Sequence, residues 1–316
     1  MNFRTKIPLV RQPHDQISYE SDLLLLGSCF AENIGSKLDY FKFQNSVNPF
    51  GILFHPIAIE KLILKAINHE SFIEEDIFHL NERWQCFSAH SSLSANSKDE
   101  LLESLNNALD LTNQRLNKST HLIITLGTAW VYRNIETDSI VANCHKVPQK
   151  KFTKELLSVE NVVESLDSIV SLVKSVNVDI SIVFTVSPVR HLKDGFVENN
   201  RSKSQLLSAI HQVVEPRKRL YYFPSYEIMM DELRDYRFYE DDMIHPNTLA
   251  IDYIWKRFKE VWISEQSMPT MDAVETIQKG LSHKPFNPES EKHHKFLADL
   301  EDKKAILQKQ FPLISF

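Results

Sequence analysis

The sequence predicts an α/β protein whose parallel sheet is covered by helices on both faces. Short runs that are apolar throughout alternate along the chain with longer stretches of helical periodicity, as expected for strands joined by crossover helices. Strands buried on both faces show such continuous apolar runs instead of an alternation of apolar and polar residues. These two observations define the fold class before any particular residue is considered.

The elements follow from the same patterns. Four apolar runs, residues 23–26, 122–126, 180–186 and 220–223, are the predicted strands, and residues 31–38 are compatible with a helix after the first of them. Apolar residues at helical spacing predict three further helices that face the core. Their stripes are Leu101, Leu102, Leu105 and Leu109; Leu156, Val159, Val163, Leu166, Val170 and Val173; and Ile251, Ile254, Trp255, Phe258, Val261 and Trp262.

Two excursions interrupt this alternation, near residues 71–97 and 130–150. Within them, residues 78–87 and 131–145 have strand-turn-strand character. Insertions at the ends of sheet strands commonly form the walls of a binding site. We therefore expect the two excursions to flank a cavity.

The sequence becomes polar after Trp262, and Asn287 followed by Pro288 predicts the N-cap and first residue of a C-terminal helix. The apolar residues of this helix are expected to pack on the body; they are Phe296, Leu297, Leu300 and Leu307. We divide the chain into an α/β domain over residues 1–264 and a helical extension over residues 265–316 packed on the same domain.

Composition excludes several classes of protein. The chain has 36 basic and 42 acidic residues, a net charge of −6, whereas nucleic-acid binding usually needs a basic face. Its six glycines compare with roughly 22 at the usual ~7% frequency, so glycine-rich nucleotide-binding loops are nearly excluded. No cofactor and no nucleic-acid partner are predicted.

The cellular location of the protein and its metal content are predicted from sequence signals that the chain lacks. Residues 1–8 lack the apolar stretch of a signal peptide, and no window approaches 18 apolar residues, so no membrane span is expected. The three cysteines, Cys29, Cys86 and Cys144, show no C-x-x-C spacing, which disfavours a disulfide framework and a zinc site with His145. We predict a cytoplasmic, reduced protein without metal; its oligomeric state is left open.

The first candidate for chemistry is Ser28, which follows Gly27 at the end of the first strand. Ligands of α/β sheets bind beyond the carboxyl ends of the strands, and a helix N-terminus favours negative charge there. A serine in this position can act as a nucleophile whose own N–H stabilises the oxyanion. The alternative is that Ser28 only caps the helix.

The second candidate is Asp242-Met243-Ile244-His245-Pro246, before the last amphipathic stripe. Three residues of spacing in a turn can place a carboxylate against one imidazole nitrogen and leave the other free as a base. Pro246 pushes His245 out of the α region. Here the alternative is that Asp242 and Asn247 cap a helix while His245 is a surface residue.

Several segments together resemble one family. Gly27-Ser28-Cys29-Phe30-Ala31 is the pentapeptide that names the GSCFA family, whose members resemble SGNH (GDSL-like) hydrolases. Similar family segments are Asn48-Pro49-Phe50-Gly51, Thr125-Leu126-Gly127-Thr128-Ala129-Trp130, Asn143-Cys144-His145-Lys146-Val147-Pro148, Ser187-Pro188-Val189-Arg190 and His283-Lys284-Pro285-Phe286-Asn287-Pro288. The resemblance covers nearly the whole chain.

The resemblance implies a flavodoxin-like three-layer α/β/α sandwich and a serine esterase with Ser28 as nucleophile, His245 as base and Asp242 as its partner. It further implies an oxyanion hole formed by the N–H groups of Ser28 and Gly51. The asparagine of the third SGNH block is missing, and the Thr128 hydroxyl or Asn48 is a candidate replacement. The substrate implied is a small acyl ester, possibly acetyl, with an acetylated carbohydrate as one candidate.

Alternatives remain at this stage. His90 and His145 lie in the excursions and are candidates for lining the pocket, although a structural role is open for both. Cys29 is disfavoured as nucleophile because a residue after such a turn usually points into the helix. An O-acyltransferase would use the same triad, and a non-catalytic ligand-binding protein would account for the missing asparagine.

Overall fold

The computed structural model describes residues 5–316 of the chain. Its central sheet is five-stranded and parallel, in the order β10-β9-β5-β1-β2. The strands are β1 (Asp22–Gly27), β2 (Gln44–Val47), β5 (His121–Leu126), β9 (Ser181–Val186) and β10 (Leu220–Tyr222). Four of them match the predicted apolar runs, which confirms the α/β class. The sequence patterns missed β2 because this half-buried edge strand consists mainly of polar residues.

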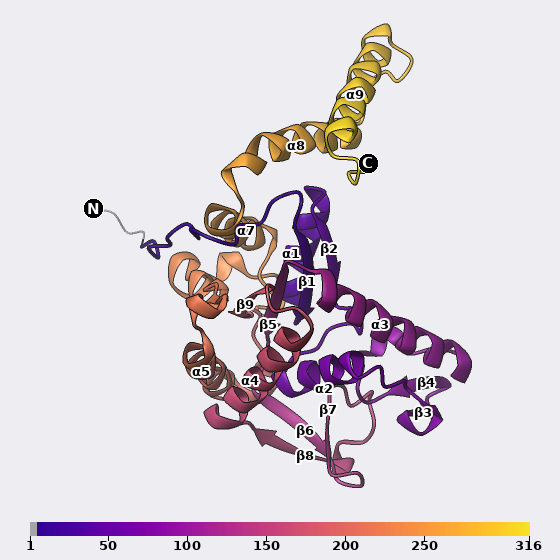
Figure 1. Ribbon diagram of the computed structural model, residues 1–316, viewed down its shortest axis with the longest axis vertical. Coiled ribbons are helices and arrows are strands. Elements are labelled where there is room, and N and C mark those ends of the chain that lie inside the picture. The colour runs from indigo at the N-terminus through magenta and orange to yellow at the C-terminus, as the bar shows by residue number, and fades with distance from the viewer. Residues whose placement is uncertain (1–4) are drawn as a thin grey trace.

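Helices cover both faces of the sheet (Figure 1). One face carries α2 (Pro56–Ile67), α3 (Lys98–Lys118), α4 (Val159–Val176) and α5 (Phe196–Val213), and the other carries α1 (Cys29–Tyr40) and α7 (Thr248–Trp262). Side chains alternate along β1, so Leu24 and Leu26 pack in the first cluster, and Leu23 and Leu25 in the second. The arrangement is consistent with the predicted three-layer α/β/α sandwich.

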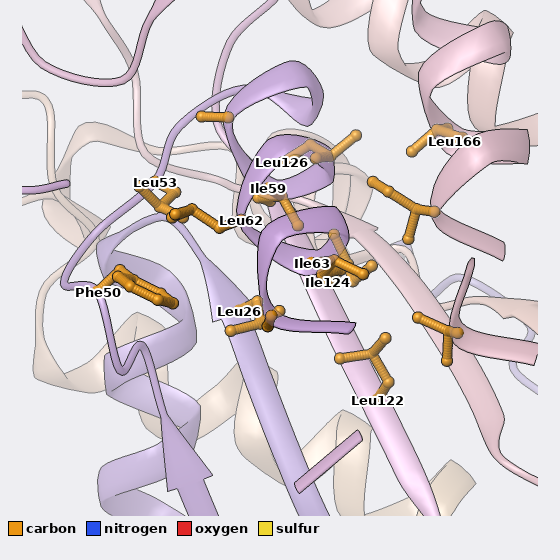
Figure 2. Packing of buried hydrophobic residues seen from close by; sticks show 14 of the residues in the cluster. Leu26, Phe50, Leu53, Ile59, Leu62, Ile63, Leu122, Ile124, Leu126 and Leu166 are labelled. Carbon is orange, nitrogen blue, oxygen red and sulfur yellow. The ribbon is translucent and has the colours of Figure 1, made fainter. Parts of the chain in front are cut away.

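The first cluster shows how the sheet is covered. Figure 2 shows Leu26 of β1 and Ile124 of β5 beside Ile59 and Ile63 of α2. On the opposite face, the short helix α6 (Ser225–Glu227) continues into a π-helical turn, Ile228–Leu233, from which Ile228, Met229 and Leu233 join the second cluster. Both faces of the sheet are therefore covered by apolar packing. The polar candidate residues lie at the carboxyl ends of its strands.

The two excursions form small antiparallel sheets outside the central one. The first is the hairpin of β3 (Ile77–Leu80) and β4 (Arg83–Cys86). The second contains β6 (Trp130–Asn134), β7 (Ser139–Val141) and β8 (Phe152–Leu156), in the order β7-β6-β8. The prediction that Leu156 belongs to a helical stripe was wrong: it ends β8, and α4 begins at Val159.

The C-terminal segment consists of α8 (Met268–Ser282) and α9 (Glu291–Gln310), which extend away from the sheet (Figure 1). The predicted helix start was wrong, because Ser290 and not Asn287 caps α9. Leu300 and Leu307 are buried as expected. Phe296 and Leu297 remain substantially exposed, because α9 packs mainly against α8 and leaves its other face uncovered. Within residues 5–316, no helix is both long and apolar enough to cross a membrane.

Candidate functional site

Ser28 lies at the junction between β1 and α1. Its residue is 1% exposed, and its Oγ accepts a hydrogen bond from the Phe30 N–H at 3.3 Å, which makes it the N-cap of α1. The preceding Gly27 has φ +134°, and a Cβ there would lie 2.1 Å from the Thr125 carbonyl oxygen. Only glycine lets β1 pass β5 this closely. The prediction that Ser28 caps the helix is thus confirmed. The cap hydrogen bond holds the Ser28 hydroxyl at the carboxyl end of β1.

Ser28 lines a cavity of about 240 Å³, which we call the Ser28 cavity. A neighbouring hollow of about 420 Å³, the outer cavity, shares Phe54, Thr128, Trp130, Tyr132 and Lys193 with it. Trp130 and Tyr132 belong to β6, so the second excursion forms a wall of both cavities. The first excursion, residues 71–97, contributes nothing to the lining of either one, so the expectation that both excursions flank the cavity was wrong for the first.

Asp242 and His245 form a pair in the loop before α7. His245 Nδ1 lies 2.7 Å from Asp242 Oδ2. Asp242 Oδ1 accepts from the N–H groups of His245 at 3.0 Å and Ile244 at 2.8 Å. These bonds, led by the His245 N–H, lower the pKa of the Asp242 carboxyl to about 2. Since an ionised carboxylate only accepts hydrogen bonds, Nδ1 carries the proton and Nε2 is the basic nitrogen.

The Asp242–His245 loop is hydrogen-bonded to a segment that follows β9, at the carboxyl end of the sheet where Ser28 also lies. The Arg190 N–H, in the segment after β9, donates to the Ile244 carbonyl at 3.1 Å, and Arg190 lines the Ser28 cavity. Asn247 caps α7, as one alternative proposed for this stretch. Both side chains of the pair are half-exposed, 49% for His245 and 46% for Asp242. No hydrogen bond joins His245 to Ser28 among the described residues.

Both N–H groups assigned to the oxyanion hole are engaged within the fold. The Ser28 N–H donates to the Thr125 carbonyl at 3.0 Å, continuing the ladder between β1 and β5. The Gly51 N–H donates to the Asn48 carbonyl at 2.7 Å, closing a turn in which Gly51 has φ +71°. In this structure neither N–H is available to a substrate oxygen.

Of the two replacement donors, Asn48 is the one with a free group. The Thr128 Oγ accepts from the Trp130 N–H at 2.9 Å and lies 3.0 Å from the Ser202 hydroxyl, so its hydrogen bonds are internal. Asn48 Oδ1 accepts from the Gly27 N–H at 2.8 Å, which places the amide beside the start of the Ser28 segment. Asn48 Nδ2 is buried and has no hydrogen-bond partner among the described residues.

The two histidines of the excursions have structural partners. His90 Nδ1 accepts from the Ser92 N–H at 3.3 Å, and its Cβ lies against Gly51. His145 is buried, and its Nε2 lies 2.6 Å from the Cys86 carbonyl oxygen. Neither residue lines the Ser28 cavity or the outer cavity. His145 thus connects the two excursions to each other, and His90 packs the first excursion against the Gly51 turn.

Cys29 differs from its expected orientation, because it lines the Ser28 cavity. Burial raises the pKa of its thiol above the ordinary value, although Lys203 partly opposes this shift. The thiolate, and not the thiol, is the nucleophile, so its surroundings disfavour attack by Cys29. Among residues 5–316, no group of three or more His, Cys, Asp or Glu side chains is placed to hold a metal ion.

Sequence patterns missed Lys203, the most buried charge at this edge. It is 1% exposed, and its Nζ donates to the carbonyls of Gly127 and Ser187 at 2.7 Å each. Burial lowers the pKa of Lys203 to about 7. A signal was present: the apolar stripe of α5 through Leu206 and Ile210 extends one turn back to Lys203, so a lysine occupies a core position.

We expect Lys203→Met to remove a pH dependence of stability. The pKa of Lys203 is about 7 in the folded chain and 10.5 in the reference state, so the unfolded chain holds this proton more tightly between those values. The free energy of unfolding of the wild type should therefore rise relative to the variant from pH 7 to 10.5, by up to about 1.4 kcal/mol per unit.

The measurement for Lys203→Met is urea denaturation of both proteins at several pH values between 7 and 9.5. The buried tyrosines titrate in both proteins, so their effect cancels in the difference. A difference that stays constant over this range would show that Lys203 keeps its ordinary pKa in the folded protein.

The chain was compared with known families and proteins. The model of the GSCFA family matches residues 22–258, and that of the C-terminal domain of GSCFA domain proteins matches residues 274–316. Comparison with curated proteins gives no match. The family match includes β1 and α1 with Ser28, and the loop with Asp242 and His245. Because it spans well over half of the sequence, this chain belongs to the GSCFA family.

Proposed function

We propose that this protein is a serine esterase of SGNH type that hydrolyses a small acyl ester. One observation carries the proposal: Ser28 lines a cavity at the carboxyl edge of the sheet, and the hydrogen-bonded Asp242–His245 pair is fastened to the same edge through Arg190 and Ile244. A hydroxyl, an imidazole and a carboxylate in this order are the components of nucleophilic ester hydrolysis.

In the proposed reaction, His245 Nε2 accepts the Ser28 proton as Oγ attacks the ester carbonyl carbon. Asp242 holds the tautomer and stabilises the imidazolium that forms. Asn48 Nδ2 is the donor proposed for the oxyanion, since it is unpartnered and lies beside Gly27. The intermediate expels the alcohol, which takes its proton from His245, and water then releases the acid in a second, equivalent step.

The proposal requires His245 to approach Ser28. Hydrogen bonds between catalytic groups are often long or absent without substrate and close in the substrate complex. The Asp242–His245 loop is half-exposed, and Met243 within it has φ +57°. Neither Asp242 nor His245 is among the residues that line the Ser28 cavity, so the proposed proton transfer requires the loop to move toward the hydroxyl.

A second candidate, a ligand-binding protein without catalysis, is favoured by one observation: the N–H groups of Ser28 and Gly51 are engaged in the fold. An O-acyltransferase would share the acyl-enzyme with the esterase and differ only in the acceptor. Supplying a sugar alcohol with p-nitrophenyl acetate separates the two, because a transferase forms the acetylated sugar and an esterase forms only free acetate.

The test of the esterase proposal is labelling with a fluorophosphonate, followed by peptide mapping. We expect the label on Ser28 in the wild type and its loss in His245→Ala, because the probe reacts with a serine activated by a base. His294→Ala, an exposed histidine on α9, is the matched control and should label normally. Absence of label from Ser28 in the wild type would favour the non-catalytic candidate.

A further inference from the structure

Arg190 is a cation without an anionic partner at the wall of the Ser28 cavity. Its Nη1 is buried and has no hydrogen-bond partner, and no carboxylate forms an ion pair with it among the described residues. Arginine side chains that are removed from water normally direct their N–H groups at carboxylate, phosphate or carbonyl oxygen. Arg190 thus keeps donors that the fold itself does not satisfy.

Aromatic rings hold the Arg190 guanidinium in place. Its central carbon lies 4.2 Å from the ring centre of Tyr239, 5.2 Å from that of Tyr236 and 5.7 Å from that of Phe196. Such contacts engage the faces of the rings and stabilise the positive charge. The guanidinium fork is the group that binds a carboxylate or phosphate in a bidentate manner, and its Nη1 has no hydrogen-bond partner in the fold.

The charges around Arg190 point to an anion. The Ser28 cavity is also lined by Lys154, Lys193 and Asp194. Lys154 and Asp194 pair with each other, whereas Lys193 has no ion pair among the described residues. The cavity therefore carries excess positive charge from Arg190 and Lys193, in a chain whose net charge is −6.

His191, next to Arg190, does not change this balance. Burial, with Lys203 as the next cause, lowers the pKa of His191 to about 4, so the imidazole is neutral at pH 7. Its Nε2 is buried and has no hydrogen-bond partner among the described residues. Two neighbouring residues thus have unmet hydrogen-bonding capacity at the cavity that contains Ser28.

We propose that Arg190 binds an anionic group of the substrate, so that the ester hydrolysed at Ser28 carries a carboxylate or a phosphate. This inference rests on the proposed function and specifies its substrate class. Arg190 acts as a binding residue that orients the ester, and it takes part in no bond-forming step. The anion lies on either the acyl or the alcohol side, and the substrates of the test separate these two sources.

The kinetic test uses matched pairs of esters that differ in one charge. On the alcohol side the pair is 3-acetoxybenzoate and 3-acetoxybenzamide, and on the acyl side mono-4-nitrophenyl adipate and 4-nitrophenyl hexanoate. We expect wild-type kcat/KM to favour the anionic member of at least one pair by about tenfold or more. Arg190→Gln should reduce that preference at least tenfold, and Arg190→Lys should restore part of it.

The ratio within a pair is the readout, because a general loss of folding or activity lowers both members equally. Arg217→Gln is the matched control. Arg217 lies before the first residue of β10, at the amino-terminal end of the parallel strands and away from the Ser28 cavity. Its replacement should leave the ratio unchanged. Equal ratios in the wild type and Arg190→Gln would overturn the assignment of Arg190.

A binding test separates this inference from the esterase proposal. Calorimetric titration with succinate and with inorganic phosphate, beside neutral succinamide, needs no catalysis. We expect at least one anion to bind to the wild type and to lose about tenfold or more in affinity in Arg190→Gln. Binding without fluorophosphonate labelling would leave Arg190 assigned and refute the esterase. Labelling of Ser28 without a preference for anions in binding or kinetics would support the esterase and refute the assignment of Arg190.

Discussion

Replacing Ser28 with alanine is expected to lower kcat/KM for p-nitrophenyl acetate by at least about 10³-fold, because an enzyme without its nucleophile retains only substrate binding and oxyanion stabilisation. The loss should appear in kcat, since the hydroxyl acts in the bond-forming step and contributes little to binding of the neutral ester. Steady-state kinetics on the purified variant, corrected for spontaneous hydrolysis, measures it.

The structural role of Ser28 requires a specific control. Ser28 caps α1 through the N–H of Phe30, two residues on, and Ser97 caps α3 through the N–H of Glu100, three residues on, at 3.2 Å. Loss of either cap should lower the free energy of unfolding by about 1 kcal/mol. We expect Ser97→Ala to match Ser28→Ala in stability and to keep wild-type activity. Similar rates in both variants would contradict a nucleophilic Ser28.

The largest expected effect on stability is that of Gly27→Ala. The new Cβ would meet the Thr125 carbonyl oxygen at 2.1 Å, and the residue would keep φ near +134°. Strained backbone of this kind and overpacking each cost about 1–3 kcal/mol, so we expect a loss of about 2–6 kcal/mol in the free energy of unfolding. Denaturation in urea measures the loss.

Gly195 provides the control for Gly27. It has φ +92°, and a Cβ there would meet nothing within 4 Å. Gly195→Ala therefore tests backbone strain alone, and the excess loss in Gly27→Ala measures the collision with β5. If the two variants lose the same stability, β1 can move away from β5 at no cost, and the position of Ser28 is less constrained than the structure indicates.

Fold and site differ in how far the sequence predicts them. Continuous apolar runs identify β1, β5, β9 and β10 because these strands are largely buried on both faces. The edge strand β2 and the transition between β8 and α4 escape prediction: Gln44 and Asn45 are polar, and Leu156 continues the spacing of the α4 stripe although it belongs to a strand. In both cases tertiary pairing outweighs the local pattern.

Within the site, local spacing predicts the Asp242–His245 hydrogen bond, because the two residues are three apart in one turn. Ser28 is found through its place after an apolar run. The engagement of its N–H by Thr125 depends on how two distant strands pair. The missing partner of Arg190 depends on every segment packed around it. Neither property is encoded in a short stretch of sequence.

The floor and the walls of the Ser28 cavity belong to different structural units. Gly27 donates its N–H to Asn48, accepts from the Leu53 N–H and packs against Thr125. Trp130 and Tyr132, in contrast, belong to the small β7-β6-β8 sheet. Substitutions in that sheet can reshape the wall of the cavity while Ser28 stays anchored in the core. In evolutionary terms, family members can diversify in specificity at little risk to foldability.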